Sequence, residues 1–352
     1  MPRFRKELHR HYLIIDLNSE QKQLYYRLIA LWAVCEGVLG GIIHGFQLPI
    51  SGLIVGGCAV IIICMIGYYV PDKNAIIKAT VVVAIFKMML SPFSPFPAYI
   101  AVFFQGLTGQ LFFSRKSWFR LACVIFGTLA LFESAIQKIL TTTLIYGVDF
   151  WKAINDFING LTHQDQITNY SLWFAGVYVV LHIIAGFLIG KMAGSAPQSL
   201  HRWKSELPEM APVIIREEIN SPKRKKHRFI KTGMLIIWVI LLVLYLQSAC
   251  QIGEPILQPG DIGNILIRSL LIVFTWYFLV SPVLTRLLKN WLMKRKEREE
   301  STVSEILQII PYTTALVEMC WQRSSARKGI GRLRIFMKDV LVQSLLPDPE
   351  KK

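Results

Sequence analysis

Polar side chains that could bind a small solute are concentrated in three consecutive apolar segments of the chain. They are Lys87, Tyr99, Gln105, Gln110, Glu133 and Gln137. An ionisable group inside a membrane span costs about 2.5–3.5 kcal/mol on insertion scales, so it should face the interior of a helix bundle or a wet cavity. Glu133 and Gln137 are one helical turn apart, so their polar atoms can converge. If these side chains meet, they form a polar pocket with apolar walls, which suits a small metabolite better than a metal ion.

Other interpretations of the ionisable residues stay open. Lys87 and Lys138 could extend toward the membrane boundary. Glu36 or Glu133 could pair with a lysine and only fix the packing of the helices. His182, in the middle of an apolar segment, is more typical of a hydrogen-bonded core residue than of a ligand.

Sequence motifs of enzymes are absent. No HExxH, GxSxG, paired-aspartate or clustered-histidine pattern occurs, so catalysis is less favoured than binding. No GxxxxGK[ST] loop occurs, so ATP hydrolysis would have to come from another chain. The six cysteines are scattered without CxxC pairs or zinc-type spacing, which predicts neither disulfides nor a metal site. We therefore expect no enzyme activity, no cofactor and no metal.

The elements that must position the polar residues are membrane helices. The chain has 352 residues and 53% hydrophobic content, and several of its apolar runs approach the roughly 20 residues that cross a bilayer. We predict an all-α polytopic membrane protein with eight spans, six followed by two. They cover about 27–48, 50–70, 75–90, 99–113, 118–146, 171–190, 232–248 and 265–280.

Two of these spans, 75–90 and 99–113, are unusually short and are joined by the proline-rich link 91–98. Irregular backbone at membrane depth is tolerated only where it is buried in protein or lines a cavity. Paired short segments of this kind are a sequence indication of a binding site.

The net charge of +16 lies in basic blocks beside the spans, as the positive-inside rule predicts, rather than in a folded nucleic-acid-binding domain. With eight spans, all these blocks fall on one side, so we expect both termini in the cytoplasm and contacts with membrane lipids. The predicted parts are a cytoplasmic segment (1–26), a six-helix membrane domain (27–191), a basic linker (192–231), a two-helix hairpin (232–285) and a basic helical tail (286–352).

Glycines recur every fourth residue in the first two spans. They are Gly37, Gly41 and Gly45 in the first span, and Gly52 and Gly56 in the second. Such spacing places small residues on one helix face, where another backbone can approach closely. We expect these two adjacent helices to pack together; for the stripe of the first span, a docking face for another subunit is the alternative.

The first six spans resemble the substrate-binding component of energy-coupling-factor (ECF) vitamin transporters, a family of six-helix membrane proteins. The resemblance rests on the glycine stripe of the first span, on the sequence QLPISG at 47–52 and on AVFFQGLTGQLFF at 101–113. It implies a site for a vitamin-like solute that opens outward.

Residues 232–352 resemble a shortened transmembrane coupling component of the same transporters. In that family, Ala-Arg-Gly signatures at the ends of cytoplasmic helices dock on paired ATPases. Ala326, Arg327 and Gly329 are similar to one signature, with Lys328 inserted, and a second signature is absent. The alternative is that this basic helix lies on anionic lipid.

Together these features predict a transport component of the bacterial cytoplasmic (inner) membrane. It would bind a small vitamin-like solute from the outer side and couple to partner ATPases for uptake. The alternatives are a non-transporting scaffold that recruits partners through its basic helices and, third, an intramembrane enzyme.

Overall fold

The computed structural model describes residues 19–41, 50–91, 94, 96–114, 118–162, 169–207, 239, 267 and 270–345. Among these residues every regular element is a helix, in agreement with the all-α prediction. Gly45, most of the predicted linker 192–231 and nearly all of the seventh span, 232–248, lie outside the described residues.

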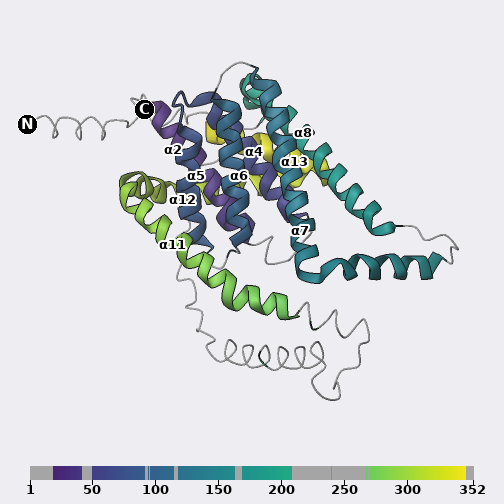
Figure 1. Ribbon diagram of the computed structural model, residues 1–352. Helices are drawn as coiled ribbons and strands as arrows, with labels where there is room; N and C mark the ends of the chain where they lie inside the picture. Colours follow the sequence, from purple (N-terminus) through teal and green to yellow (C-terminus); the bar gives the residue numbers. More distant parts are fainter. Residues whose placement is uncertain are drawn as a thin grey trace, which may run out of the picture.

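The helices follow one another in chain order, with a π-helical turn after α2 and another before α11 (Figure 1). They are α2 (Ser19–Val34), η1 (Cys35–Leu39), α4 (Ser51–Tyr69), α5 (Ala75–Leu90), α6 (Phe96–Phe113), α7 (Phe119–Thr162), α8 (Tyr170–Glu206), η2 (Trp276–Val280), α11 (Ser281–Arg298), α12 (Glu300–Arg323), η3 (Ser324–Ala326) and α13 (Gly329–Leu345).

Within the described part of the chain, five helical stretches are long and apolar enough to cross a membrane. They are Ser51–Tyr69, Phe96–Phe113, Phe119–Leu144, Tyr170–Glu206 and Leu270–Glu297. A multi-pass helical membrane protein is therefore supported, while the count of eight spans stays a prediction.

Two helices run far beyond their predicted spans. Helix α7 continues as an amphipathic extension past Gly147, whose φ of 78° marks a kink, and Figure 1 shows the extension turning away from the bundle. Helix α8 passes without a break through residue 191, where we predicted a domain boundary, and ends only at Glu206.

The backbones of α7 and α8 approach each other closely. A Cβ atom on Gly127 would lie 2.7 Å from the carbonyl oxygen of Gly186 and 3.1 Å from Cα of Gly190. These backbones can approach so closely because all three residues lack a side chain. Gly186 and Gly190 also have four-residue spacing, and they are a close-packing stripe that the sequence analysis did not single out.

The glycines of the first two spans face side chains of other helices. Gly37 packs against Leu90 at the end of α5, with a Cβ position 2.9 Å from Leu90 Cβ. Gly56 faces α6 and α7, where its Cβ position lies 3.3 Å from Gln105 Nε2 and 3.1 Å from Leu131 Cδ2. The first two spans pack on each other, as predicted, while these glycines accommodate side chains of α5, α6 and α7.

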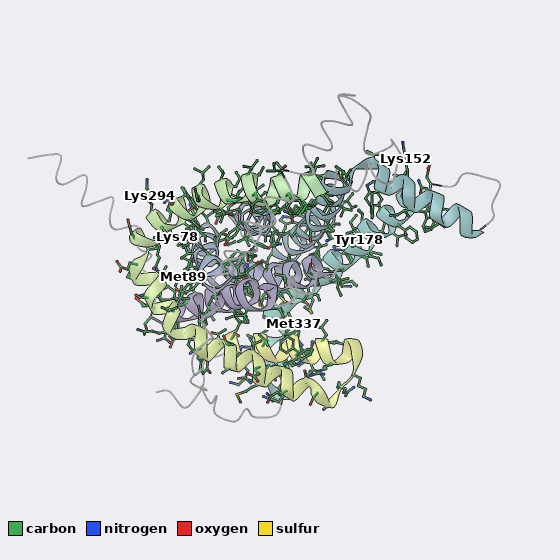
Figure 2. All side chains as sticks on the ribbon, turned by 90° about the horizontal axis from the view of Figure 1, so that it is seen from below. Lys78, Met89, Lys152, Tyr178, Lys294 and Met337 are labelled. Carbon is green, nitrogen blue, oxygen red and sulfur yellow. The ribbon has the colours of Figure 1, made fainter. Side chains whose placement is uncertain are left out.

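The C-terminal hairpin, which we define as α12, η3 and α13, packs on the ends of α2 and α8 (Figure 2). Lys338 of α13 lies 3.0 Å from a carboxylate oxygen of Glu206 and stands over the ring of Trp203. Lys22 of α2 forms an exposed ion pair with Glu305 of α12 at 3.3 Å. The predicted tail is thus docked on the membrane domain.

Candidate functional site

A buried ion pair joins the first and third predicted spans. The Lys87 ammonium donates to Glu36 Oε2 at 2.6 Å, and both side chains are at most 4% exposed. The same nitrogen lies 6.0 Å from the centre of the Tyr99 ring. Lys87 therefore points into the bundle rather than toward the membrane boundary, and its partner is Glu36 rather than Glu133.

Local backbone geometry brings the two charges together. Glu36 belongs to the π-helical turn η1, and single π-helical turns inside α-helices are often found at functional sites. Gly37 and Gly41 of the same stretch leave room for Leu90 and Ser91. The end of α5 can therefore approach η1, which places Lys87 within reach of Glu36.

A second polar group lies between α4, α6 and α7. Gln105 is 3% exposed, and its Oε1 atom accepts no hydrogen bond from the described residues. Glu133 Oε2 is a second buried acceptor to which no described residue donates a hydrogen bond. Gly56 of α4 touches both Gln105 and Leu131 of α7. Glu133 lies one helical turn before Gln137, whose amide donates to Pro97 of α6. The two acceptors thus belong to α6 and α7, which pack on each other.

Unpartnered acceptors of this kind are unusual. Most buried side-chain polar atoms in proteins have a hydrogen-bond partner, and each exception needs an explanation such as a function or a bound molecule. Leaving an acceptor without a donor costs about 1–3 kcal/mol. The arrangement can therefore bind a molecule that supplies N–H or O–H donors.

Gln137 and Gln110 fasten opposite ends of α6. Gln137 donates to the carbonyl oxygen of Pro97 at 2.8 Å, close to Tyr99. Gln110 donates to the carbonyl oxygen of Lys73 and accepts from the Ile77 amide at 3.3 Å. The Gln110 side chain is thus used by the turn before α5, and it stands apart from the other predicted site residues.

His182 is buried on α8, and its Nδ1 atom lies 2.9 Å from the carbonyl oxygen of Tyr178 one turn earlier. This contact fits the interpretation of a hydrogen-bonded core histidine. In the described ranges, no three His, Cys, Asp or Glu residues are grouped so that they could hold a metal ion.

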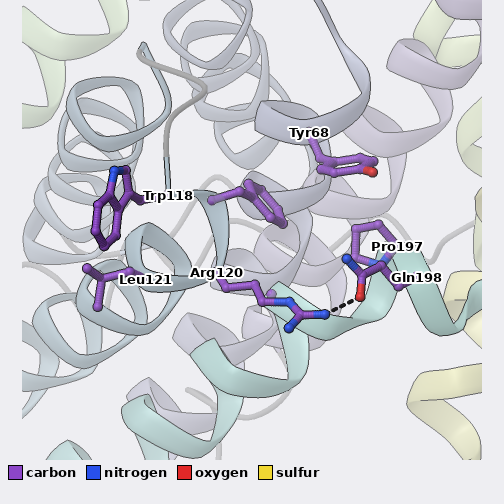
Figure 3. A pocket seen from close by; sticks show the side chains of 8 residues that line it. Tyr68, Trp118, Arg120, Leu121, Pro197 and Gln198 are labelled. Atoms are coloured by element: carbon purple, nitrogen blue, oxygen red, sulfur yellow. Dashed lines mark hydrogen bonds between the residues drawn. The ribbon is translucent and has the colours of Figure 1, made fainter.

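A surface pocket of about 420 Å³ lies at the far end of the bundle, where α4 ends and α7 begins (Figure 3). Its lining residues are Tyr68, Trp118, Phe119, Arg120, Leu121, Gly194, Pro197 and Gln198. The Arg120 guanidinium donates to the side-chain oxygen of Gln198. This pocket is separate from every predicted site residue.

The three predicted coupling residues lie at the tip of the C-terminal hairpin. Ala326 ends η3, Arg327 follows in extended conformation, and Gly329 begins α13 with a φ of 59°. All three are exposed. Arg332 of α13 contacts α12 next to this tip: its guanidinium lies over the Trp321 ring, 4.0 Å from the ring centre.

The core of the C-terminal hairpin contains a partly compensated charge. Asp339 is 1% exposed and lies 3.5 Å from the Arg323 guanidinium. Burial raises the pKa of Asp339, and Arg323 opposes this shift. Burial also raises the pKa of the neighbouring Cys320 thiol to about 12. The hairpin interior therefore disfavours negative charge.

Comparison of the chain with known protein families, with curated proteins and with solved structures found no match.

Proposed function

We propose that this protein binds a small solute inside its helix bundle and takes part in the uptake of that solute across a bacterial cytoplasmic membrane. The observation that carries the proposal is the pair of buried acceptors, Gln105 Oε1 and Glu133 Oε2, to which no described residue donates. A solute with N–H or O–H donors would offset the cost of burying them.

The charges around the site narrow the chemistry of the solute. The buried cation nearest the predicted site, Lys87, is already neutralised by Glu36 at 2.6 Å. A carboxylate ligand would have to compete with Glu36 for that ammonium, whereas Glu133 offers a carboxylate to a donor. The site therefore suits a neutral or cationic solute that carries amine, amide or hydroxyl donors.

Uptake against a gradient would need energy from a partner, which we place at the tip of the C-terminal hairpin. Support comes from the exposure of Arg327 and from the docking of the hairpin on α2 and α8, through which a partner could act on the membrane domain. The resemblance to ECF coupling helices suggests ATPase subunits, with both termini in the cytoplasm.

Native mass spectrometry of protein extracted directly from its membrane tests solute binding. The wild-type chain should carry a small-molecule adduct that Gln105→Leu and Glu133→Leu each abolish. Gln110→Leu is the matched control, because Gln110 lies on the same helix but is bonded to the turn before α5; it should retain the adduct. Wild-type protein without any adduct, or an adduct that survives in both site variants, would refute the proposal.

Arg327→Glu tests the coupling surface separately. We expect this variant to lose copurifying ATPase subunits and to keep the adduct, since Arg327 is exposed and remote from Gln105. A scaffold that only recruits partners is the second candidate, favoured by the same exposed tip. It would show a partner that depends on Arg327 and no adduct.

A further inference from the structure

The pocket at the start of α7 is lined by three apolar helices, α4, α7 and α8. Tyr68 is at the end of the candidate span Ser51–Tyr69, and Phe119 begins the candidate span Phe119–Leu144. The third wall comes from α8 through Pro197 and Gln198. Two of the three walls belong to the ends of candidate membrane spans, and Pro197 and Gln198 lie seven and eight residues beyond the predicted span 171–190. This placement fits the depth of lipid headgroups.

One positive charge faces an otherwise uncharged surface. Arg120 is the single charged residue among the eight that line the pocket, and it is exposed. Figure 3 shows Arg120 reaching from the side of Leu121 toward Gln198. A guanidinium has five N–H donors in a planar fork that matches phosphate oxygens. The Gln198 contact holds this fork in place at the pocket.

Trp118 stands at the rim in an uncommon conformation. Its φ is 66°, and the ring is 76% exposed. A bulky residue in the left-handed region stores strain of about 1–3 kcal/mol, and such strain often accompanies function. Tryptophan is also enriched at membrane interfaces, where its ring lies at headgroup level.

An apolar track leads from the pocket into the depth of the membrane. Leu121, Ile125, Leu129 and Phe132 of α7 are each at least 38% exposed. Their spacing of four, four and three residues places them on one face of the helix. The pocket and the track together offer a polar end and an apolar path of the kind that a phospholipid needs.

We propose that this pocket binds an anionic glycerophospholipid. Arg120 contacts the headgroup phosphate, Trp118 covers the glycerol region, and one acyl chain follows Leu121 and Ile125 along α7. Basic pockets between membrane helices are known to bind anionic headgroups. Arg115 and Lys116, which precede Trp118 in the sequence, add positive charge to this stretch of the chain. The lipid site is independent of the solute site.

Binding of two probe lipids to the delipidated full-length protein, measured by native mass spectrometry, tests the proposal. The probes are phosphatidylglycerol and phosphatidylcholine with identical acyl chains. Arg120→Gln should weaken phosphatidylglycerol binding by at least about tenfold, as expected for one charge-assisted hydrogen bond. Phosphatidylcholine, whose choline cation offsets its phosphate charge, should bind the wild type more weakly and should lose less affinity in this variant. Arg202→Gln, which changes an exposed arginine of α8 outside the pocket, should alter neither affinity.

Further arms distinguish the lipid from other ligands and from misfolding. Arg120→Lys should restore part of the lost affinity, because it keeps the charge but not the fork. Trp118→Ala should weaken both lipids. Equal binding of the two lipids to the wild type, or an Arg202→Gln loss as large as that of Arg120→Gln, would overturn the proposal. So would displacement of phosphatidylglycerol by millimolar inorganic phosphate, which would identify a site for soluble anions.

Discussion

The Glu36–Lys87 pair allows a quantitative test of how charges are accommodated in the bundle. We consider three variants: Glu36→Gln, Lys87→Met and the combination of both. In Glu36→Gln, the Lys87 ammonium, which is 2% exposed, loses its partner. In Lys87→Met, the Glu36 carboxylate loses its partner. The combination leaves no charge at this position.

The expected magnitudes follow from the 2.6 Å separation. At an effective dielectric constant of about 20, two unit charges at this distance attract by about 6 kcal/mol. Taking both ions out of water costs several kcal/mol each, so the intact pair is close to balance. Each single variant leaves one uncompensated buried charge and should lose about 3–5 kcal/mol of unfolding free energy. The double variant should lose less than either single one.

Unfolding by SDS in mixed micelles, followed by tryptophan fluorescence, measures these free energies. Lys22→Met is the control, since the Lys22–Glu305 pair is 46% exposed on both sides and should contribute less than about 1 kcal/mol. The reasoning would be refuted if the single variants lost no more than Lys22→Met. It would also be refuted if the loss in the double variant equalled the sum of the two single losses.

Three further predictions concern other parts of the chain. Gly127→Ala should lower the unfolding free energy in the SDS titration by about 1–3 kcal/mol, because the new Cβ would lie 2.7 Å from a backbone oxygen of α8. Gly176→Ala is the control: a Cβ there would meet nothing within 4 Å, so this variant should be neutral or stabilising. Burial raises the pKa of Asp339 above its usual 3.8 despite Arg323, so the folded state binds this proton more tightly and stability falls as pH rises through the folded pKa. The melting temperature of the wild type should therefore rise relative to that of Asp339→Asn when the pH is lowered from 7.5 to about 4, near the usual pKa of 3.8. A difference that stays constant over this range would contradict the prediction. Gly329→Ala, at a φ of 59°, should cost about 1–2 kcal/mol in thermal melts followed by circular dichroism.

Apolar runs predicted where membrane helices lie better than where they end. The predicted span 75–90 coincides with α5, because Asn74 and Ser91 bound a mostly apolar run. Helix α6 begins at Phe96 rather than at residue 99, since a proline such as Pro97 is tolerated in the first helical turn. Hydropathy marks the membrane boundary, but a helix can continue into water. For this reason α8 extends to Glu206, beyond the predicted boundary at residue 191.

Partners across the bundle could be predicted only in part. The residue types indicate that Lys87 can pair with a glutamate, but they leave both Glu36 and Glu133 as possible partners. That choice depends on how closely α5 approaches η1. Gly37 permits this approach, because a Cβ atom at its position would lie 2.9 Å from Leu90 Cβ. Gln110 is, like Gln105, a glutamine beside a glycine in the same apolar segment, yet its amide is bonded to the turn before α5. Such assignments require the relative rotation of the helices, and hydrophobic periodicity alone does not fix that rotation.

We assign the Glu36–Lys87 pair to stability, and Gln105 and Glu133 to solute binding. Helix α6 contributes Tyr99 to one and Gln105 to the other, and six residues of helix separate them by about 9 Å. A solute that is held by Gln105 and extends less than this distance toward Tyr99 would not contact the Glu36–Lys87 pair. The double variant Glu36→Gln/Lys87→Met should therefore retain the small-molecule adduct that Gln105→Leu abolishes. If instead both the double variant and Gln105→Leu lose the adduct, the solute contacts the Lys87 ammonium. The solute would then be an anion that competes with Glu36.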